Sequence, residues 1–458
     1  MKMYRHLLFF ASCLVLFGCS DTHLKEGGQE EEEVLFTAPE DRLTQFRITT
    51  SGLSIPDEPK VDAQLAISQN EVVSYTGTIG IEVRGSSSQQ FPKKSFGFET
   101  RDSANEDIDV SLLGFPEEED WILYAPYSDK SLVRNALIYD LSRDLGRYAS
   151  RVEFVDVTIN GSYNGVYVFM EKLKRDSNRI DINKLKEDEN SGEDLTGGYI
   201  LKIDKAGGFS ETTYTDQNSF TSGFLPNDAS TGQQIHFLYE DPDADDITTA
   251  QRDYISNYMN AFETALASDQ FTNPTSGYAS YIDTQSFIDF FLLNELSNNV
   301  DGYRLSTWLT KDKNEKLKMG PIWDFNLAFG NANYCDGGAT DVWAYRFNER
   351  CSGDFWVLPF WWVRLLEDPG FVSQLQSRWE ELRGANFSKG AILGQIDAYT
   401  ETLIRSGATR ENFEKWPVIG SYVWPNNYIG NSYSEENAYL KNWIQDRLLW
   451  MDSAIEGL

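Results

Sequence analysis

The sequence predicts an α+β fold in which a β-rich half precedes a mainly helical half. Apolar residues alternate with polar ones through much of residues 42–125 and 152–171, which is the period of half-buried strands. From residue 248 onward, apolar residues recur at the spacing of helices. We therefore predict a β-rich lobe over residues 41–245 and a mainly helical lobe over residues 246–458, and we find no internal repeat.

The N-terminus predicts export and a lipid anchor. Residues 1–19 begin with basic side chains and continue with an apolar run too short to span a membrane stably. The run ends in LFGC, which resembles a lipobox, so we expect a signal peptide and a lipid on Cys19. Residues 20–40 are rich in Gly and Glu without apolar periodicity, as in an acidic flexible tether. We expect an exported lipoprotein, on the outer membrane or cell surface, that contacts the membrane through its lipid alone.

In the β-rich half, we predict strands, one helix and then further strands. The period becomes helical between Asp129 and Arg147, where Asp or Ser caps the start and Gly146 marks the end. Asn-Gly pairs beginning at positions 160 and 164 predict a tight hairpin between VDVTI and GVYVFMEK. The strands are marked by Phe46 and Ile48, by Ala63, Leu65 and Ile67, by Ile79, Ile81 and Val83, by Phe96 and Phe98, and by the segment Tyr199–Ile203.

Helices dominate the second half. The predicted helices span Thr248–Ala267, Thr284–Ser297, Pro369–Leu382 and Ser434–Ala454. The aromatic group Trp356, Phe360, Trp361 and Trp362 would suit a sugar ring, but we favour packing inside the helical half.

Composition excludes several classes of site. The formal net charge of -31 disfavours nucleic acid as a partner, because its phosphates would be repelled over most of the surface. A small anionic ligand remains compatible with a local group of Lys and Arg and a divalent ion. His6 lies in the signal and His23 in the tether, so a Ser-His-Asp triad or a Cys-His pair would require His236. Chemistry would otherwise depend on carboxylates, Lys, Arg and a hard cation.

Two cysteines remain for the folded part once Cys13 leaves with the signal and Cys19 carries lipid. These are Cys335 and Cys351, in a compartment where disulfides persist. Their spacing permits a disulfide that closes one loop. The alternative is two unpaired buried cysteines, and we favour the disulfide.

Two carboxylates near the start of the helical half form the candidate catalytic pair. The segment KMGPIWDFNLAFGN, residues 318–331, places Asp324 among large apolar residues, where a carboxylate is costly unless a cation or a donor meets it. A surface turn explains this segment equally well when it is taken alone. Asp301, in NELSNNVDGYR at a predicted helix end, supplies a second acid. Such a pair suits metal-assisted phosphoryl transfer, in which one acid accepts the hydroxyl proton and the other holds the metal.

The loop RGSSSQQFPKKS, residues 84–95, joins two predicted strands. Gly85 and three serines, including Ser87, allow backbone N–H groups to approach a phosphate, and Lys93 or Lys94 can reach it from the next strand. Because adjacent strand residues face opposite ways, only one of the two lysines points inward. The glycine spacing matches neither a Walker A nor a dinucleotide loop, and a solvated hairpin loop is the alternative.

Two further charged residues have two interpretations each. Arg134 either accompanies that lysine toward an anion or pairs with Asp129 on the surface, which we favour slightly. Glu171 either contacts the base or ribose of a nucleotide or is an ordinary charge at a strand end.

Five segments, in their order along the chain, resemble the CotH (spore coat protein H) kinase-like family. They are RGSSSQQFPKKSF, LGFPEEEDWILYAPYSDKSLVRNAL, NGSYNGVYVFMEKLKRD, NELSNNVDGYR and KMGPIWDFNLAFGN. The similarity extends over about residues 42–345 and, more loosely, through the C-terminal helices. It implies an atypical protein-kinase-like fold whose two lobes enclose ATP and Mg or Mn. It also implies transfer of the γ-phosphate to a Ser or Thr hydroxyl of a secreted or surface protein.

The resemblance also implies roles for individual residues. Asp301 would be the base and Asp324 the metal ligand, with Asn326 beside it. Lys94 or Lys93 would hold the nucleotide phosphates, and Glu171 would lie near the nucleotide. The full set predicted to bind nucleotide is Arg84, Ser87, Lys93, Lys94, Arg134 and Glu171.

Two departures from the family pattern support a second hypothesis. Asn326 stands where the family often has the second acid of WDxD, and Ser306 stands where a kinase catalytic loop keeps Asn for a second metal. The second hypothesis is a catalytically weak or inactive surface lipoprotein of the same fold that binds a protein or glycan partner. A glycosidase using the same pair of acids ranks third, since aromatic content alone supports it.

Overall fold

The structure is a computed structural model that describes residues 42–207, 213–230 and 232–458. The predicted signal peptide, the lipidation site at Cys19 and the tether lie outside the described residues. The described part belongs to one compact unit and combines strands with helices, so the predicted α+β class is confirmed.

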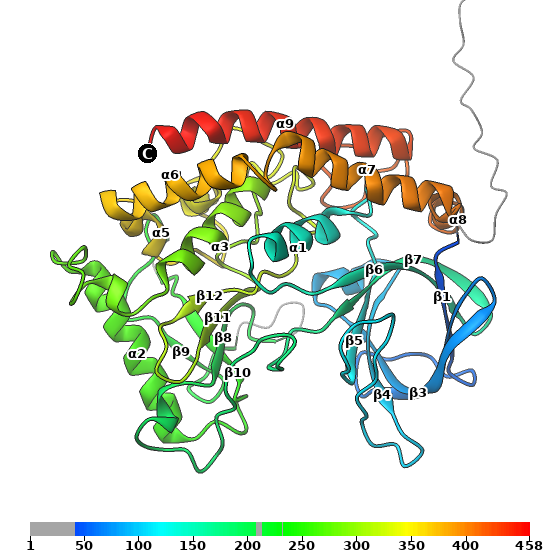
Figure 1. Ribbon diagram of the computed structural model, residues 1–458, viewed down its shortest axis with the longest axis horizontal. Helices are drawn as coiled ribbons and strands as arrows, with labels where there is room; N and C mark the ends of the chain where they lie inside the picture. Colours follow the sequence, from blue (N-terminus) through cyan, green and yellow to red (C-terminus); the bar gives the residue numbers. More distant parts are fainter. Residues whose placement is uncertain (1–41, 208–212, 231) are drawn as a thin grey trace, which may run out of the picture. The chain divides into compact units, whose positions relative to one another are not determined.

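Seven strands of the first half close into a barrel (Figure 1). They are β1 (Thr44–Thr49), β2 (Val61–Gln69), β3 (Val72–Arg84), β4 (Ser95–Arg101), β5 (Asp120–Tyr124), β6 (Val152–Ile159) and β7 (Ser162–Glu171). Their order is β1-β2-β3-β4-β5-β7-β6, and the parallel pairing of β1 with β6 closes the barrel. The other neighbouring pairs are antiparallel, and a short 3₁₀ helix, η2 (Ser87–Gln90), lies between β3 and β4.

The alternation seen in the sequence builds the core of this barrel. Every second side chain of a strand points to the same face, and Phe46, Ile81, Phe98 and Trp121 are almost fully buried inside. The ring of Phe169 lies 5.2 Å from that of Phe46 and 5.1 Å from that of Trp121, centroid to centroid. The barrel therefore has its own apolar core.

The hairpin predicted between β6 and β7 is present. Asn160 and Gly161 adopt positive φ angles of 49° and 78°, the conformation that a two-residue turn of this kind requires. The second Asn-Gly pair lies within β7, where Gly165 passes under Asn412 and Trp416.

A second sheet contains β8 (Tyr199–Ile203), β9 (Ser219–Thr221), β10 (His236–Asp241), β11 (Thr307–Lys311) and β12 (Lys318–Met319). Its order is β12-β11-β8-β10-β9, and all its pairs are antiparallel. The division that we predicted at residue 245 therefore cuts through a sheet, because β8 and β10 belong with β11. Periodicity predicts each strand separately and does not identify the distant strand with which it pairs. This explains why the predicted boundary differs from the observed sheet.

Helices surround this sheet and the inner end of the barrel. They are α1 (Arg134–Asp144), α2 (Thr249–Ala267), α3 (Thr284–Ser297), α4 (Phe347–Arg350), α5 (Trp361–Leu365), α6 (Pro369–Arg383), α7 (Lys389–Arg405), α8 (Ala408–Lys415) and α9 (Tyr433–Glu456), with 3₁₀ helices η3 (Asp194–Thr196), η4 (Tyr278–Ser280) and η5 (Ala344–Arg346). Figure 1 shows α6, α7 and α9 as a layer over α1 and α3. Every residue from Ser286 to Ser297 is buried, so α3 is the central helix.

The helices α2, α3, α6 and α9 begin within a residue of the predicted positions, whereas α7 was not among the predicted helices. Thr248 caps α2 in a capping box with Gln251, and the side chain of Asp283 accepts from the Ser286 N–H at the start of α3. The first predicted helix begins later, at Arg134, since Asp129 caps the chain ahead of it by accepting from the Arg134 N–H at 2.9 Å. None of the helices in the described ranges combines the length and apolar content needed to cross a bilayer.

Candidate active site

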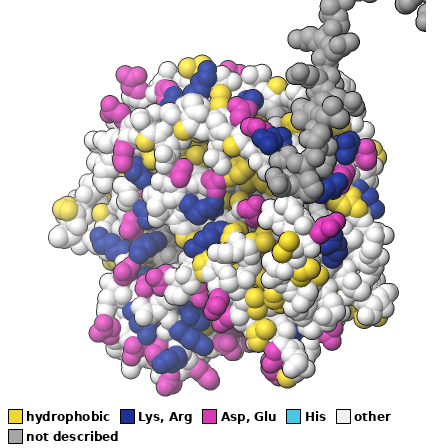
Figure 2. Space-filling model, turned by 45° about the vertical axis from the view of Figure 1, so that its right-hand side comes forward, with side chains coloured by type: hydrophobic (Ala, Val, Ile, Leu, Met, Phe, Trp, Pro, Cys, Tyr) yellow, Lys and Arg dark blue, Asp and Glu magenta, His cyan; other side chains and the backbone are white. Residues whose placement is uncertain are grey.

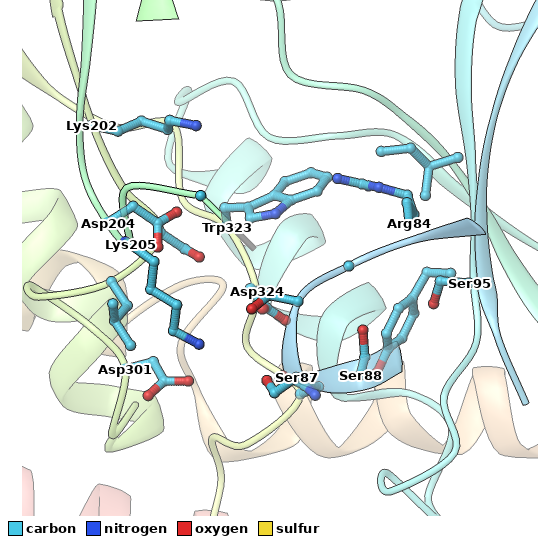
Figure 3. A pocket seen from close by; sticks show the side chains of 18 of the residues that line it. Arg84, Ser87, Ser88, Ser95, Lys202, Asp204, Lys205, Asp301, Trp323 and Asp324 are labelled. Atoms are coloured by element: carbon cyan, nitrogen blue, oxygen red, sulfur yellow. Dashed lines mark hydrogen bonds between the residues drawn. The ribbon is translucent and has the colours of Figure 1, made fainter. Parts of the chain in front are cut away.

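A cavity of about 590 Å³ lies where the loop after β3 faces the ends of β8 and α3 and the segment after β12. Figure 3 shows the side chains on its walls. Arg84, Ser87, Ser88 and Ser95 lie on the barrel side; Lys202, Asp204, Lys205 and Asp301 lie on the opposite side; Trp323 and Asp324 lie between.

Helix α1 holds the turn that carries Asp324. The backbone N–H of Asp324 donates to the Tyr139 hydroxyl at 3.2 Å, and the N–H of Phe325 donates to Asn135 Oδ1 at 2.8 Å. Asp324 has a φ of 61°, in the left-handed region, which Asp adopts more readily than most residues. The Phe325 side chain is buried behind the turn, so the carboxylate of Asp324 faces the cavity.

The Asp324 carboxylate has no hydrogen bond or ion pair with any described residue. Burial raises its pKa from 3.8 to about 6, and the nearby carboxylates of Asp301 and Asp204 add to the rise, whereas Arg84 and Lys205 oppose it. Burial also raises the pKa of Asp204. A half-buried carboxylate beside two others is stabilised when a cation binds among them.

Asp301 is held more firmly than Asp324. It follows α3, whose last turn ends in a left-handed Asn298, and its N–H donates to Asn299 Oδ1 at 3.2 Å. Its Oδ1 accepts from Arg304 Nη2 at 3.0 Å and from the Tyr334 hydroxyl at 3.4 Å. These donors orient the carboxylate, while its position on the cavity wall keeps it accessible to a ligand.

Arg84 and Lys205 lack a carboxylate partner within ion-pair distance among the residues that the structure covers. The Arg84 guanidinium lies 5.5 Å from the centroid of the Trp323 ring, and burial lowers its pKa. Lys205 Nζ lies 5.3 Å from the centroid of the Trp356 ring. By contrast, Lys202 Nζ pairs with Glu240 Oε2 at 2.6 Å. Two cations are therefore free to meet an anion in the cavity.

The oxygen ligands on the cavity wall fit a hard divalent cation. The carboxamide of Asn326 lines the cavity and, within the described part of the chain, forms no hydrogen bond. Together with Asp324 it offers the oxygen donors that Mg²⁺ and Mn²⁺ prefer. The cavity lining contains no His or Cys, so a zinc or copper site does not fit it.

The structure brings five of the predicted site residues to this cavity and leaves four outside it. Arg84, Ser87, Asp301, Asp324 and Asn326 line it. Lys93, Lys94, Arg134 and Glu171 do not.

Lys93 points inward, but into the contact between the barrel and α8. Its ammonium group donates to Asn412 Oδ1 at 2.9 Å and to the carbonyl of Val166, and it lies 4.8 Å from the centroid of the Tyr167 ring. Burial lowers its pKa to about 7. Lys94 turns back and donates to the carbonyl of Gln89. The barrel therefore presents Arg84 to the cavity and neither lysine.

Arg134 and Glu171 have structural partners. Arg134 pairs with Asp129, as we favoured, but both are almost fully buried rather than on the surface. Its Nε also donates to the carbonyl of Ala328 at 3.1 Å, so it supports the segment that carries Asp324. Glu171 is fully buried and accepts from the backbone N–H of Arg151 at 2.9 Å and from its guanidinium.

Sequence reasoning missed the contribution of β8. Lys202 and Asp204 come from LKIDK at the end of this strand, and Lys205 follows them. Lys202 lies in β8 and Asp204 directly after it, two positions apart, the spacing at which an extended chain directs side chains to the same side; this signal was present in the sequence. The pairing of β8 with β11, which directs that face to the cavity, was not visible in it.

Cys335 and Cys351 form a disulfide, with their Cα atoms 5.4 Å apart. It closes the loop that follows the Asp324 segment. Trp361 and Trp362 are buried in the helical half, as the packing interpretation predicted, whereas Trp356 is half-buried next to Lys205.

A second group of acids lies outside the cavity. Glu118, Glu119 and Asp120 bring one oxygen each within 4.8 Å of one another. Lys174 Nζ already contacts all three, at 2.6, 2.7 and 3.1 Å. The lysine takes the place that a cation would occupy, so these residues need no metal.

Comparison with known proteins agrees with the resemblance found in the sequence. A family model described as CotH kinase protein matches residues 81–451. The chain is also 26% identical over 183 residues to the inner spore coat protein H of Bacillus subtilis (strain 168). That alignment covers 40% of this chain and 44% of the relative, so the chain spans less than half of that protein's length.

Proposed function

Because the chain belongs to the CotH kinase protein family, we propose that its cavity binds ATP with Mg²⁺ or Mn²⁺ and transfers the γ-phosphoryl group to a hydroxyl group. The observation that carries this proposal is the arrangement of Asp324 and Arg84, two oppositely charged groups that line one cavity and have no ion-pair partner among the described residues. A metal–nucleotide complex offers a cation to the first and phosphates to the second.

Asp324 and Asn326 would hold the divalent ion. The ion, when bound, neutralises charge on the phosphates and orients them. The hydrogen bonds that the turn donates to α1 fix where Asp324 presents its oxygens, and this positioning is the contribution of the protein.

Arg84, Lys205 and the serine loop would hold the phosphates. Guanidinium groups bind phosphate with two parallel hydrogen bonds, and the loop offers backbone N–H groups next to Ser87 and Ser88. Gly85 at the start of the loop has a φ of 104°, and a Cβ there would lie 2.1 Å from Ser88 Oγ. The tight loop therefore requires glycine at this position.

Asp301 would accept the proton of the attacking hydroxyl. Two donors, Arg304 and Tyr334, fix the direction of its carboxylate. The acceptor that the family resemblance suggests is a Ser or Thr of an exported or surface protein. The proposed location outside the cytoplasm rests on the signal peptide predicted from the sequence.

Asn326 favours the second candidate, a weakly catalytic or inactive binding protein. A carboxamide oxygen is neutral and holds a divalent ion less tightly than a carboxylate. This candidate retains the fold and the cavity but predicts little or no transfer.

The two candidates are distinguished by transfer of label from γ-labelled ATP to the protein itself, with Mn²⁺ or Mg²⁺ present. We expect autophosphorylation that Asp324→Ala and Asp301→Ala abolish. The matched control is Asp188→Ala, which removes an exposed carboxylate outside the cavity. Equal labelling of the wild type and both site variants would refute the assigned roles, and no labelling with intact nucleotide binding would favour the second candidate.

A further inference from the structure

Two aromatic side chains, Tyr334 and Trp424, form a shelf beside the proposed site of transfer. Trp424 lines the same cavity as Asp301 and is 49% exposed. Its ring is parallel to that of Tyr334, with an interplanar angle of 4° and 6.3 Å between centroids. The Tyr334 hydroxyl donates to Asp301 Oδ1 at 3.4 Å. The shelf therefore adjoins the carboxylate that we assign as the proton acceptor.

The shelf is fixed by backbone hydrogen bonds. The Asn333 N–H donates to the carbonyl of Pro425 at 2.9 Å, and the Asn427 N–H donates to the carbonyl of Asn331 at 2.8 Å. The buried carboxamide of Asn426 donates to Asn331 Oδ1 at 3.0 Å and to the carbonyl of Ser128 at 2.7 Å. These bonds hold together the two segments that carry the rings, so a ligand that binds there loses less free energy to ordering of the backbone.

Amide and phenol groups border the shelf, and the charged groups near Tyr334 are Asp301, its partner Arg304, and Asp354. Asn333 Nδ2 donates to the Tyr422 hydroxyl at 3.1 Å, and Asn427 Nδ2 donates to the Tyr439 hydroxyl at 2.9 Å. The indole N–H of Trp424 has no hydrogen-bond partner among the residues described. Flat aromatic faces bordered by hydrogen-bonding groups fit a ring that has apolar faces and hydroxyl groups at its edge. A sugar has this chemistry.

We propose that the shelf binds a sugar ring of the acceptor and that the phosphoryl group goes to a sugar hydroxyl. The sugar oxygen forms a new bond to the γ-phosphorus as the bond from that phosphorus to the β–γ bridging oxygen breaks. ADP leaves with that electron pair, and Asp301 takes the hydroxyl proton. The transfer step rests on the proposed function, whereas sugar binding by the shelf is measured without nucleotide.

The first test uses saturation-transfer NMR to measure binding to the full chain without nucleotide. The sugars offered are cellohexaose, xylohexaose, mannohexaose and chitohexaose. We expect at least one of them to bind. Trp424→Leu, which removes the aromatic face, should weaken that binding on the order of tenfold, and Trp424→Phe should retain more of it. Phe355→Leu changes an exposed aromatic ring outside the cavity lining and should have no effect. Absence of binding, or equal binding by Trp424→Leu, would overturn the proposal.

The second test offers the bound oligosaccharide and a Ser-containing, Lys-rich peptide together, with γ-labelled ATP and Mn²⁺. Label on the oligosaccharide that decreases in Trp424→Leu supports the proposal. Label on the peptide alone overturns it and leaves the proposed function intact. Failure of nucleotide to bind refutes the proposed function, and the binding test then decides separately whether the shelf recognises sugar.

Discussion

Replacing Asp324 by asparagine should stabilise the protein in the absence of ligand. The Asp324 carboxylate has no hydrogen-bond donor or ion pair among the described residues, so asparagine loses no bond and has nearly the same shape. What it removes is a charge that burial and two neighbouring carboxylates disfavour. We therefore predict that Asp324→Asn abolishes metal-dependent nucleotide binding and yet raises the free energy of unfolding.

The raised pKa sets the size and the pH range of this effect. A shift from 3.8 to about 6 corresponds to about 3 kcal/mol between the two protonation states. Because the folded pKa lies above the unfolded one, the stability contributed by protonated Asp324 is fully present below about pH 4. It is lost as the pH rises through about 6. Asparagine stays neutral, so the difference between variant and wild type should grow from near zero at pH 4 to about 3 kcal/mol above pH 7.

The assay is urea unfolding followed by tryptophan fluorescence, at pH 4, 6 and 8, for the wild type and Asp324→Asn. Asp188→Asn, at an exposed carboxylate outside the cavity, should change stability by less than about 0.5 kcal/mol at each pH. If Asp324→Asn is less stable than the wild type at pH 8, or if the difference does not depend on pH, the reasoning about an unpaired, buried charge is wrong.

Two further variants test the phosphate contact and the support of the metal-binding turn. Arg84→Met should weaken ATP binding, measured by calorimetry, by about 10- to 100-fold, because it removes charge-assisted hydrogen bonds to phosphate that contribute about that much to the affinity. Arg47→Met, at an exposed position, should leave the affinity unchanged. Tyr139→Phe removes the acceptor of the Asp324 N–H, so we expect about tenfold slower transfer with nearly unchanged ATP affinity. Tyr163→Phe, which removes a hydrogen bond to Asp156 outside the cavity, should lower stability by about 1 kcal/mol without slowing transfer.

Local patterns in the sequence were sufficient to predict most of the individual elements. The helices α2, α3, α6 and α9 begin within a residue of the predicted positions, because capping residues and apolar spacing act over a few residues. The closure of the barrel by β1 and β6 and the pairing of β8 with β11 join segments about 100 residues apart. Periodicity contains no information about such partners, so the sheet to which each strand belongs could not be predicted from it.

The same limit applies to the candidate site. Alternation along a strand predicted that Lys93 and Lys94 face opposite ways, but it could not say what lies on each side. Asn412 on α8 lies on the inward side and accepts a hydrogen bond from the ammonium group of Lys93. Arg84, at the end of β3, is therefore the cation that the barrel contributes to the cavity. Asp324 was identified because it stands among large apolar residues, and Asp301 because it lies at a predicted helix end; both are local signals that the sequence does contain.

The most direct test of the account is a calorimetric titration of ATP into the wild-type protein with Mn²⁺ and, separately, with EDTA. We predict binding that requires the metal and disappears in Asp324→Asn. Equal affinity in EDTA, or an unchanged affinity of Asp324→Asn for the Mn²⁺–ATP complex, would contradict it.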